Sequence, residues 1–348
     1  MPGNPIGDPV IPVPRDEWDA VISASPDALA FHAPNWSDAV CASGSWVDAT
    51  LFFRAASGGR LVVPMVRRSG VAGRLAPRAS LPYGWGFGGV VASPETTPDE
   101  FRMVVAHLAD SAGEPTTVRP NPLLRDRWAE SVPAQSATVQ RGAHVLDLEG
   151  GFERVFKERF KGRARTAVRK AERSGVTVER DTTGRLVADF YSLYRSSLDR
   201  WAERRRIPTW LGRRLGETRD PRRKFEDVAS RLREGCRIWL ARVDDQPAAA
   251  LICLVRGSNA SYWRGCMDEE RASRTQASHL LQKLAIEDAC NSGCLHYHMG
   301  ETGGSRSLAQ FKEGFGARLH LYEEFRFSGT RPLRRTTARL ASGLRRSA

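Results

Sequence analysis

Residues 262–317 read YWRGCMDEERASRTQASHLLQKLAIEDACNSGCLHYHMGETGGSRSLAQFKEGFGA, and this stretch decides the fold class. β-rich runs alternate there with runs of helical spacing, at Ala260–Cys266 (strand), Thr275–Asn291 (helix), Leu295–Met299 (strand), Ser307–Gly314 (helix) and Leu319–Phe327 (strand). Strands and helices in this alternation predict a mixed α/β fold, with a central sheet flanked by helices.

The pattern extends upstream to about residue 153. Apolar residues recur at helical spacing from Phe156 to Ala171, and Val187–Arg204 and Phe225–Glu234 have the same character;. Two further β-rich runs, Arg237–Val243 and Ala248–Val255, are joined by a short polar turn;. We therefore expect the second half to form one mixed α/β unit.

The first half follows a similar order. Residues 16–43 predict two helices, with Asp16 and Asn35 as N-caps;. Trp46–Ala55 and Arg60–Arg67 predict a hairpin around Ser57-Gly58-Gly59, and Arg141–Leu148 predicts a strand at the end of this half;.

The length and composition limit the number of domains and the class of protein. The chain has 348 residues, 41% of them hydrophobic, enough for two domains of roughly 150 residues each;. We expect a flexible tail at 1–14, a first domain at 15–152, a second at 153–328 and a basic tail at 329–348. The six cysteines suit a reducing compartment;. Neither a secretory signal nor a membrane-spanning run is evident, which predicts a cytoplasmic protein.

Several segments together resemble the Fem family (FemAB/FemX-type) of peptidyltransferases in the GNAT superfamily. BioF2-like acetyltransferase-domain proteins are similar to them as well. The resemblance lies in FKGRARTAVRKAERSGVTV (160–178), in FYSLYRSSLDR (190–200), in the opening stretch 262–317 and in Asn35-Trp36. It implies tandem GNAT-like domains, each with a mixed central sheet, and no coiled-coil arm. It also implies aminoacyl transfer from tRNA to the amine of a peptidoglycan precursor or small metabolite.

The same resemblance implies a reaction centre at Phe311 and Lys312. Lys312 would stabilise the charge of the tetrahedral oxyanion, and Phe311 would shape the site; one well-placed donor to such an oxyanion changes the rate by roughly 10²–10³. Direct attack by the amine needs no enzyme nucleophile. Glu301, in the preceding loop, is a candidate acceptor for the amine proton. The alternative for Lys312 is a solvated helix lysine.

Three further residues match family positions that hold the acceptor. Arg200 and Tyr262 would grip the phosphates and the peptide, since an arginine fork suits phosphate, and Trp36 would line the same site. The alternatives are a surface ion pair for Arg200 with Glu203 or Glu217, and a core position for Trp36.

Positive charge is concentrated as well as abundant. The formal net charge is +13, and Arg154–Arg173 holds nine basic residues against two acidic ones. Lys161, Arg165, Arg169 and Arg173 recur every four residues and predict a basic ridge for the phosphates of tRNA;. A solvated helix face is the alternative. The basic tail at 329–348 leaves peripheral contact with the inner face of the membrane open.

The sequence also bears on bound metals and on two alternative functions. The Cys290, Cys294, His296 and His298 spacing does not suit tetrahedral zinc, so we expect no metal and no resident cofactor;. An acyl-CoA donor, with a sugar or polysaccharide acceptor, is the second hypothesis. Arg271–Ala277 lacks the glycines of a pyrophosphate loop, which disfavours it. A catalytically inactive RNA-binding protein is the third.

Overall fold

A large twisted sheet organises the molecule. The computed structural model describes residues 6–70, 76–110, 114–134 and 136–327, and within them an 11-stranded sheet runs through both halves. In spatial order its strands are β1 (Trp46–Asp48), β4 (Val66–Arg68), β5 (Arg78–Ala79), β7 (Thr116–Val118), β14 (Arg318–Phe327), β8 (Ala137–Asp147), β13 (His296–Glu301), β12 (Asn259–Met267), β11 (Gln246–Arg256), β10 (Cys236–Val243) and β9 (Thr177–Asp181).

A smaller sheet lies in the first half. It consists of β2 (Leu51–Arg54), β3 (Arg60–Val63) and β6 (Val91–Ala92). The hairpin predicted for Trp46–Ala55 and Arg60–Arg67 is thus divided between two sheets. Its inner parts pair as β2 and β3 around Gly58, whose φ of +86° a glycine accepts readily, while its outer parts pair as β1 and β4 in the large sheet;.

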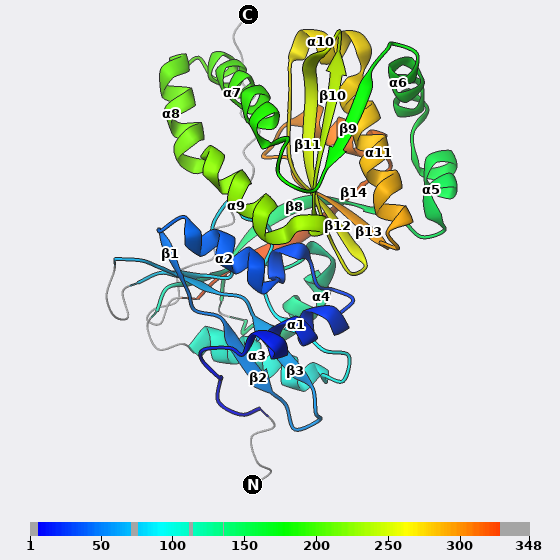
Figure 1. Cartoon of the computed structure of the whole chain (residues 1–348). Helices are drawn as coiled ribbons and strands as arrows, with labels where there is room; N and C mark the ends of the chain where they lie inside the picture. Colours follow the sequence, from blue (N-terminus) through cyan, green and yellow to red (C-terminus); the bar gives the residue numbers. More distant parts are fainter. Residues whose placement is uncertain (1–5, 71–75, 111–113, 135, 328–348) are drawn as a thin grey trace, which may run out of the picture.

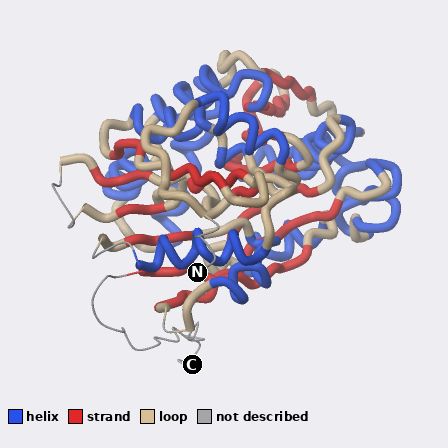
Figure 2. The backbone as a smooth tube through the Cα atoms, turned by 90° about the horizontal axis from the view of Figure 1, so that it is seen from below, coloured by secondary structure: helices blue, strands red, loops and turns tan. Residues whose placement is uncertain are grey.

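Helices cover both faces of the large sheet (Figure 1). The first half holds α1 (Arg15–Ala24), η1 (Ala30–His32), α2 (Pro34–Ala42), α3 (Pro98–Asp110), η3 (Pro122–Leu124) and α4 (Arg125–Ser131). The second half holds α5 (Gly151–Arg154), the π-helix η4 (Val155–Arg159), α6 (Gly162–Glu172), α7 (Val187–Arg204), α8 (Thr209–Arg219), α9 (Arg222–Leu232), η5 (Arg233–Gly235), α10 (Glu269–Thr275), α11 (Ala277–Asn291) and α12 (Arg306–Gly314). Seen from below, the strands cross the width of the molecule between these helices (Figure 2).

β8 and β14 join the halves. β8 lies between β13 and β14, and β14 pairs at its far end with β7 of the first half. Because these pairings are continuous, the sheet does not end at the predicted boundary between residues 152 and 153. That boundary stays a prediction.

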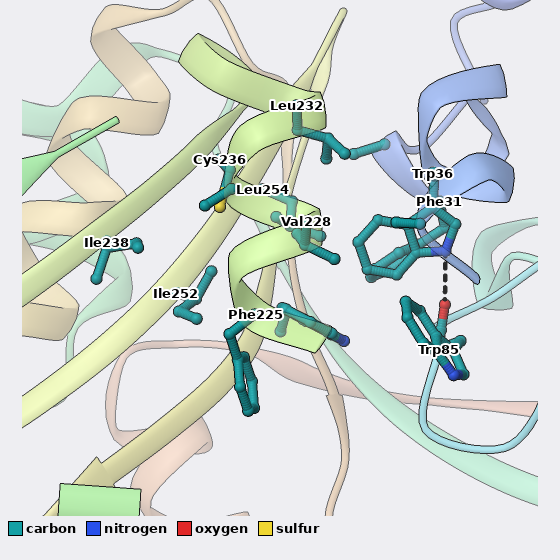
Figure 3. Close-up of a cluster of buried hydrophobic side chains, with 14 of the residues drawn as sticks. Phe31, Trp36, Trp85, Phe225, Val228, Leu232, Cys236, Ile238, Ile252 and Leu254 are labelled. Atoms are coloured by element: carbon teal, nitrogen blue, oxygen red, sulfur yellow. Dashed lines mark hydrogen bonds between the residues drawn. The ribbon is translucent and has the colours of Figure 1, made fainter. Parts of the chain in front are cut away.

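Two cores fill the faces of the second half. On one face α11 packs with Phe160, Tyr297 and Phe315. On the other, α7 and α9 pack with residues of the first half. Figure 3 shows Phe225 of α9 together with Trp36 and Trp85, and the dashed line marks the bond from the Trp36 indole N–H to the Trp85 carbonyl, 3.1 Å long.

Several elements differ from their predictions. The helix expected over Phe156–Ala171 is interrupted at Phe160, whose ψ of 125° is extended and whose ring packs edge-on against Phe315. α8 was not anticipated. Residues 6–13, expected in a flexible tail, lie against the small sheet, where Ile6 and Val10 form bridges to Ala55 and Phe52.

The overall class is as predicted. The fold is mixed α/β with a large central sheet, and the described residues include no long coiled-coil arm. None of the described helices combines the length and the apolar character needed to cross a membrane. The basic tail predicted at 329–348 lies outside the described residues.

Candidate active site

The site begins where two neighbouring parallel strands separate. β12 and β13 pair at three positions, the last being Ser261 opposite His298. Beyond this point β12 pairs with β11 alone and β13 with β8 alone. A bulge in β12 accompanies the separation, because Trp263 has no partner residue on β11;. Ligands of open α/β sheets bind at diverging carboxyl ends of this kind.

Lys312 lies at the carboxyl end of β13. α12 begins after a loop in which Gly300, Gly303 and Gly304 all have positive φ, and the Ser305 side chain caps its first turn. The Lys312 side chain is 1% exposed, and its ammonium donates to the carbonyl oxygens of Gly300 at 2.9 Å and Glu301 at 2.8 Å. An ammonium has three donors, and the described residues provide no third acceptor. The two bonds hold the ammonium at the end of β13.

The protonation of Lys312 is finely balanced. Burial lowers its pKa to about 7, while the nearby negative charge of Glu301 opposes that shift;. The ammonium and amine forms thus coexist near neutral pH, which is typical of functional lysines.

Phe311, the neighbour of Lys312 on α12, packs against aromatic side chains. Its ring lies 5.0 Å from the His279 ring of α11 and 5.1 Å from Phe315, both in edge-on geometry. The two adjacent side chains of α12 therefore have separate surroundings: Phe311 lies against α11, and Lys312 lies against the end of β13.

Glu301 connects Lys312 to a polar row on strands β8 and β14. Its backbone carbonyl binds Lys312, and its carboxylate accepts the Tyr322 hydroxyl at 3.0 Å and lies 3.6 Å from Arg141. Arg141 also binds Glu324, which is 4% exposed. Burial, together with the Glu301 charge, raises the pKa of Tyr322, so its hydroxyl stays a donor.

His144 was not singled out by sequence. It lies opposite Gly300 across the β13–β8 pair and is 2% exposed. Its Nε2 is 3.6 Å from the Glu313 carboxylate, and neither ring nitrogen has a hydrogen-bond partner in the described residues. Burial and the charge of Lys312 lower its pKa. Because it lies next to Gly300 and senses the charge of Lys312, we treat His144 as a candidate site residue.

The other predicted site residues do not meet at Lys312. Arg200 donates to the Met267 carbonyl at 2.9 Å and lies 3.2 Å from the Glu269 carboxylate, so it fixes the end of β12. Tyr262 packs in the core beneath α11. Trp36 is fully buried between Phe31 and Trp263. Substrate contact by these three residues stays a prediction.

The basic ridge does reach the candidate site. The Lys161 backbone N–H donates to the Gly314 carbonyl at 2.8 Å, and its ammonium is 3.7 Å from the Glu313 carboxylate, next to Lys312. Arg165, Arg169 and Arg173 continue from there along α6, and they form no ion pair with a described carboxylate. Positive charge therefore runs from the surface of α6 to α12.

A second buried cluster joins the halves. The Asp220 carboxylate, 0% exposed, accepts from Lys224 Nζ at 2.8 Å, Arg219 Nε at 2.9 Å and Arg264 at 3.1 Å, as well as from the Tyr194 hydroxyl. Burial alone would raise the pKa of Asp220, but these cations outweigh it and hold the pKa well below its usual range.

Lys224 and Arg264 continue across the boundary between the halves. Both donate to the Gly84 carbonyl of the first half, and the Lys224 ammonium lies 4.0 Å from the Trp85 ring centre. Because these contacts connect α9 and β12 to the Gly84–Trp85 segment, we interpret the cluster as a clamp between the halves.

Two other expectations concern bound groups. The described residues contain no group of three or more His, Cys, Asp or Glu side chains placed to hold a metal. The segment Arg271–Ala277, where a pyrophosphate loop would lie, is mostly α10, and Gln276 turns directly into α11 with a φ of +63°. The segment thus lacks a glycine-rich loop, but it ends at the N-terminus of α11, where the first N–H groups have no partner inside the helix;.

Comparisons with known proteins agree with this architecture. A family model described as "Acetyltransferase (GNAT) domain" matches residues 158–313. The crystal structure of FemX is 12% identical, covers 91% of this chain and 96% of its own, and has a TM-score of 0.63.

Two further solved structures are similar to this chain. The C-terminal domain of a putative lysylphosphatidylglycerol synthetase from Agrobacterium fabrum is 15% identical, with 90% and 91% coverage and a TM-score of 0.53. L-PGS from Bacillus licheniformis is 12% identical, with 94% and 95% coverage and a TM-score of 0.52. At such identities the likeness concerns the fold. No curated protein matches the sequence. The predicted Fem-like GNAT fold is confirmed.

Proposed function

We propose, from the premise that residues 158–313 form a GNAT acetyltransferase domain within a Fem-like fold, that the chain transfers an acyl group to an amine. The observation that carries this proposal is the placement of the Lys312 ammonium at the end of β13, where β13 separates from β12. In this proposal the acyl carbonyl binds at the separation, with its oxygen toward the Lys312 ammonium.

The chemistry follows from these groups. The acceptor nitrogen forms a bond to the acyl carbon, and the carbonyl oxygen becomes an oxyanion that the Lys312 ammonium stabilises. The Glu301 carboxylate takes the proton from the attacking nitrogen. The bond from carbon to the leaving oxygen then breaks, and that oxygen receives the proton. No covalent enzyme intermediate is needed.

We further propose that aminoacyl-tRNA is the donor. The basic ridge supports this choice, because Lys161 lies beside Glu313 and so connects the exposed arginines of α6 to the reaction centre. Phosphates bound along α6 would place the esterified end of a tRNA near Lys312. The sequence of Arg271–Ala277 supports it further, because it lacks the glycine of a CoA pyrophosphate loop. The acceptor is a peptidoglycan precursor or a small amine-bearing metabolite.

Acyl-CoA is the second candidate donor, and the matching GNAT model is the observation in its favour. One experiment separates the two. The protein is incubated with tRNA charged with radiolabelled amino acids or with labelled acetyl-CoA. The acceptors are a muramyl pentapeptide with a free side-chain amine and a pool of amines.

The donor proposal predicts transfer from charged tRNA that RNase pretreatment abolishes. Transfer from acetyl-CoA alone would contradict the proposal that tRNA is the donor. The proposal that the chain transfers an acyl group would stand. If the chain binds tRNA and transfers from neither donor, it is the non-catalytic RNA-binding protein of the third hypothesis.

A further inference from the structure

α8 presents a face that packs against nothing in the described part of the chain. Gly212 and Gly216 bring it close to α7: a Cβ on Gly212 would lie 2.4 Å from the Ala202 Cβ, and one on Gly216 would lie 2.3 Å from Leu198. In Figure 1 α8 forms the outer edge of the molecule, with α7 between it and the sheet. The face opposite the two glycines therefore points away from the protein.

The outer surface of α8 carries large apolar side chains where a soluble helix is ordinarily polar. Helical spacing places Trp210, Arg214 and Thr218 opposite the two glycines, with Leu211 and Leu215 along one flank of that face. Trp210 is 64% exposed and Leu215 is 59% exposed, which puts both among the exposed large hydrophobic residues of the described chain. Next to Trp210 is an open hollow of about 460 Å³, lined by Thr209, Trp210, Arg213, Arg214, Glu217 and Thr218. Clustered exposed apolar groups of this kind mark interaction surfaces.

Positive charge surrounds these apolar groups. Arg205, Arg206 and Arg214 are exposed and form no ion pair with a described carboxylate. The stretch Arg200–Lys224 holds ten basic residues against three acidic ones. Partners that bury tryptophan and leucine while neutralising arginine are anionic lipid surfaces.

We propose that the α8 face, defined as Trp210, Leu211, Arg214 and Leu215 with the adjacent Arg205 and Arg206, docks on an anionic lipid membrane. Trp210 enters the interfacial layer, the leucines enter the acyl boundary, and the arginines bind lipid phosphates. This surface lies on α8, outside the residues assigned to acyl transfer, so the proposal stands whether or not the proposed function holds.

Other occupants fit these features less well. Leucine contributes nothing to base stacking, so RNA would leave Leu211 and Leu215 unused. A symmetric contact with a second copy would bring the unpaired arginines of both copies into one interface. The chain's own residues 331–348 carry six arginines and no acid, so they would be repelled from this face.

Vesicle sedimentation with the full chain tests the proposal. We expect binding to phosphatidylglycerol–phosphatidylcholine vesicles that weakens with salt, and far weaker binding to phosphatidylcholine alone. The double variant Trp210→Ser/Leu215→Ser should lower the partition constant by about tenfold or more. Burial of even one such side chain changes a binding constant by about tenfold. Leu295→Ser/Val47→Ser, which alters exposed apolar residues elsewhere, should bind as wild type does.

Fluorescence gives an independent readout. Trp210 is the tryptophan in the described chain with an exposed side chain, so vesicles should shift the emission to the blue in wild type. The shift should be lost in Trp210→Phe, which still binds. Unchanged vesicle binding by the double variant would overturn the proposal. A double variant that binds vesicles normally but loses tRNA binding would also overturn it. A wild-type dimer that the double variant abolishes would do the same.

Discussion

Lys312 has three properties that suit an oxyanion donor. It is buried, it donates to two carbonyl oxygens, and its pKa is about 7. The two bonds fix the ammonium at the end of β13, and a fixed donor stabilises an oxyanion without reorganising during the reaction. Because the charged form stabilises the oxyanion, the rate should depend on the protonation of this residue.

The pH profile of transfer follows from that pKa. As pH rises through about 7, Lys312 loses its proton and the transfer rate should fall. In Lys312→Arg the guanidinium keeps its charge, so this alkaline decline should disappear even if the rate at low pH is reduced. Single-turnover rates with hydroxylamine as acceptor avoid titration of an alkyl amine. Identical alkaline declines in both proteins would show that Lys312 is not the titrating group.

A substitution at Glu301 provides a second test of the pKa of Lys312. Its negative charge raises the pKa of Lys312, so Glu301→Gln should move the alkaline decline to lower pH and reduce the maximal rate. Glu323→Gln, a nearby change on β14, should leave the midpoint of the decline in place. A midpoint that moves to higher pH in Glu301→Gln would contradict the assignment.

Sequence predicts part of this site and not the rest. The glycine-rich loop before QFKEGFG indicates a turn into a short helix, so the position of Lys312 can be predicted, although its burial cannot. Arg141, His144 and Tyr322 lie in strands far along the chain and reach Glu301 or Gly300 only through strand pairing. Without the register of β8, β13 and β14, nothing in their local sequence marks them.

At the scale of elements, the junction of α6 and α12 connects donor binding to chemistry. The break at Phe160 frees the Lys161 N–H to bind the Gly314 carbonyl. Apolar periodicity continues smoothly through Phe156–Ala171, which is why sequence predicts a single helix there. α8 escapes prediction for a related reason: its inner face is formed by Gly212 and Gly216, so it has no apolar stripe facing the core.

The α6 ridge should bind tRNA through phosphates. Replacing Arg165, Arg169 and Arg173 with Gln should weaken tRNA binding and reduce the salt slope by about 0.7–0.9 for each phosphate that the ridge no longer neutralises. Filter binding across a salt series measures both quantities. Arg222→Gln/Arg223→Gln, which removes arginines already paired with Glu226 and Asp227, serves as the control. An unchanged slope in the triple variant would exclude α6 as the phosphate surface.

At the scale of the molecule, the halves form one sheet and share one buried clamp. β8 and β14 carry the sheet across the middle, and the Asp220 cluster holds the Gly84 loop against α9 and β12. Sequence predicts two α/β halves of about the right size. It cannot predict their common sheet, because strand order depends on pairings between residues far apart in the chain, such as Thr116 of β7 and Phe327 of β14.

The clamp makes a prediction about stability. Asp220→Asn leaves three cations without their common carboxylate and should lower the free energy of unfolding by about 3–5 kcal/mol. Asp227→Asn, which breaks the surface pair with Arg223 on α9, should change it by about 1 kcal/mol or less;. Chemical denaturation followed by tryptophan fluorescence compares the two. Equal, small losses would mean that the cluster does not hold the halves together.

The central claim is that acyl transfer takes place at the end of β13 with the Lys312 ammonium as the oxyanion donor. The most direct measurement is the single-turnover transfer rate of Lys312→Met from charged tRNA, compared with wild type and with Lys283→Met, a lysine paired with Glu287 on α11. We predict a loss of roughly 10²–10³-fold for Lys312→Met, an undiminished rate for Lys283→Met, and folded protein in both cases by circular dichroism. A folded Lys312→Met protein that transfers as fast as wild type would contradict the account.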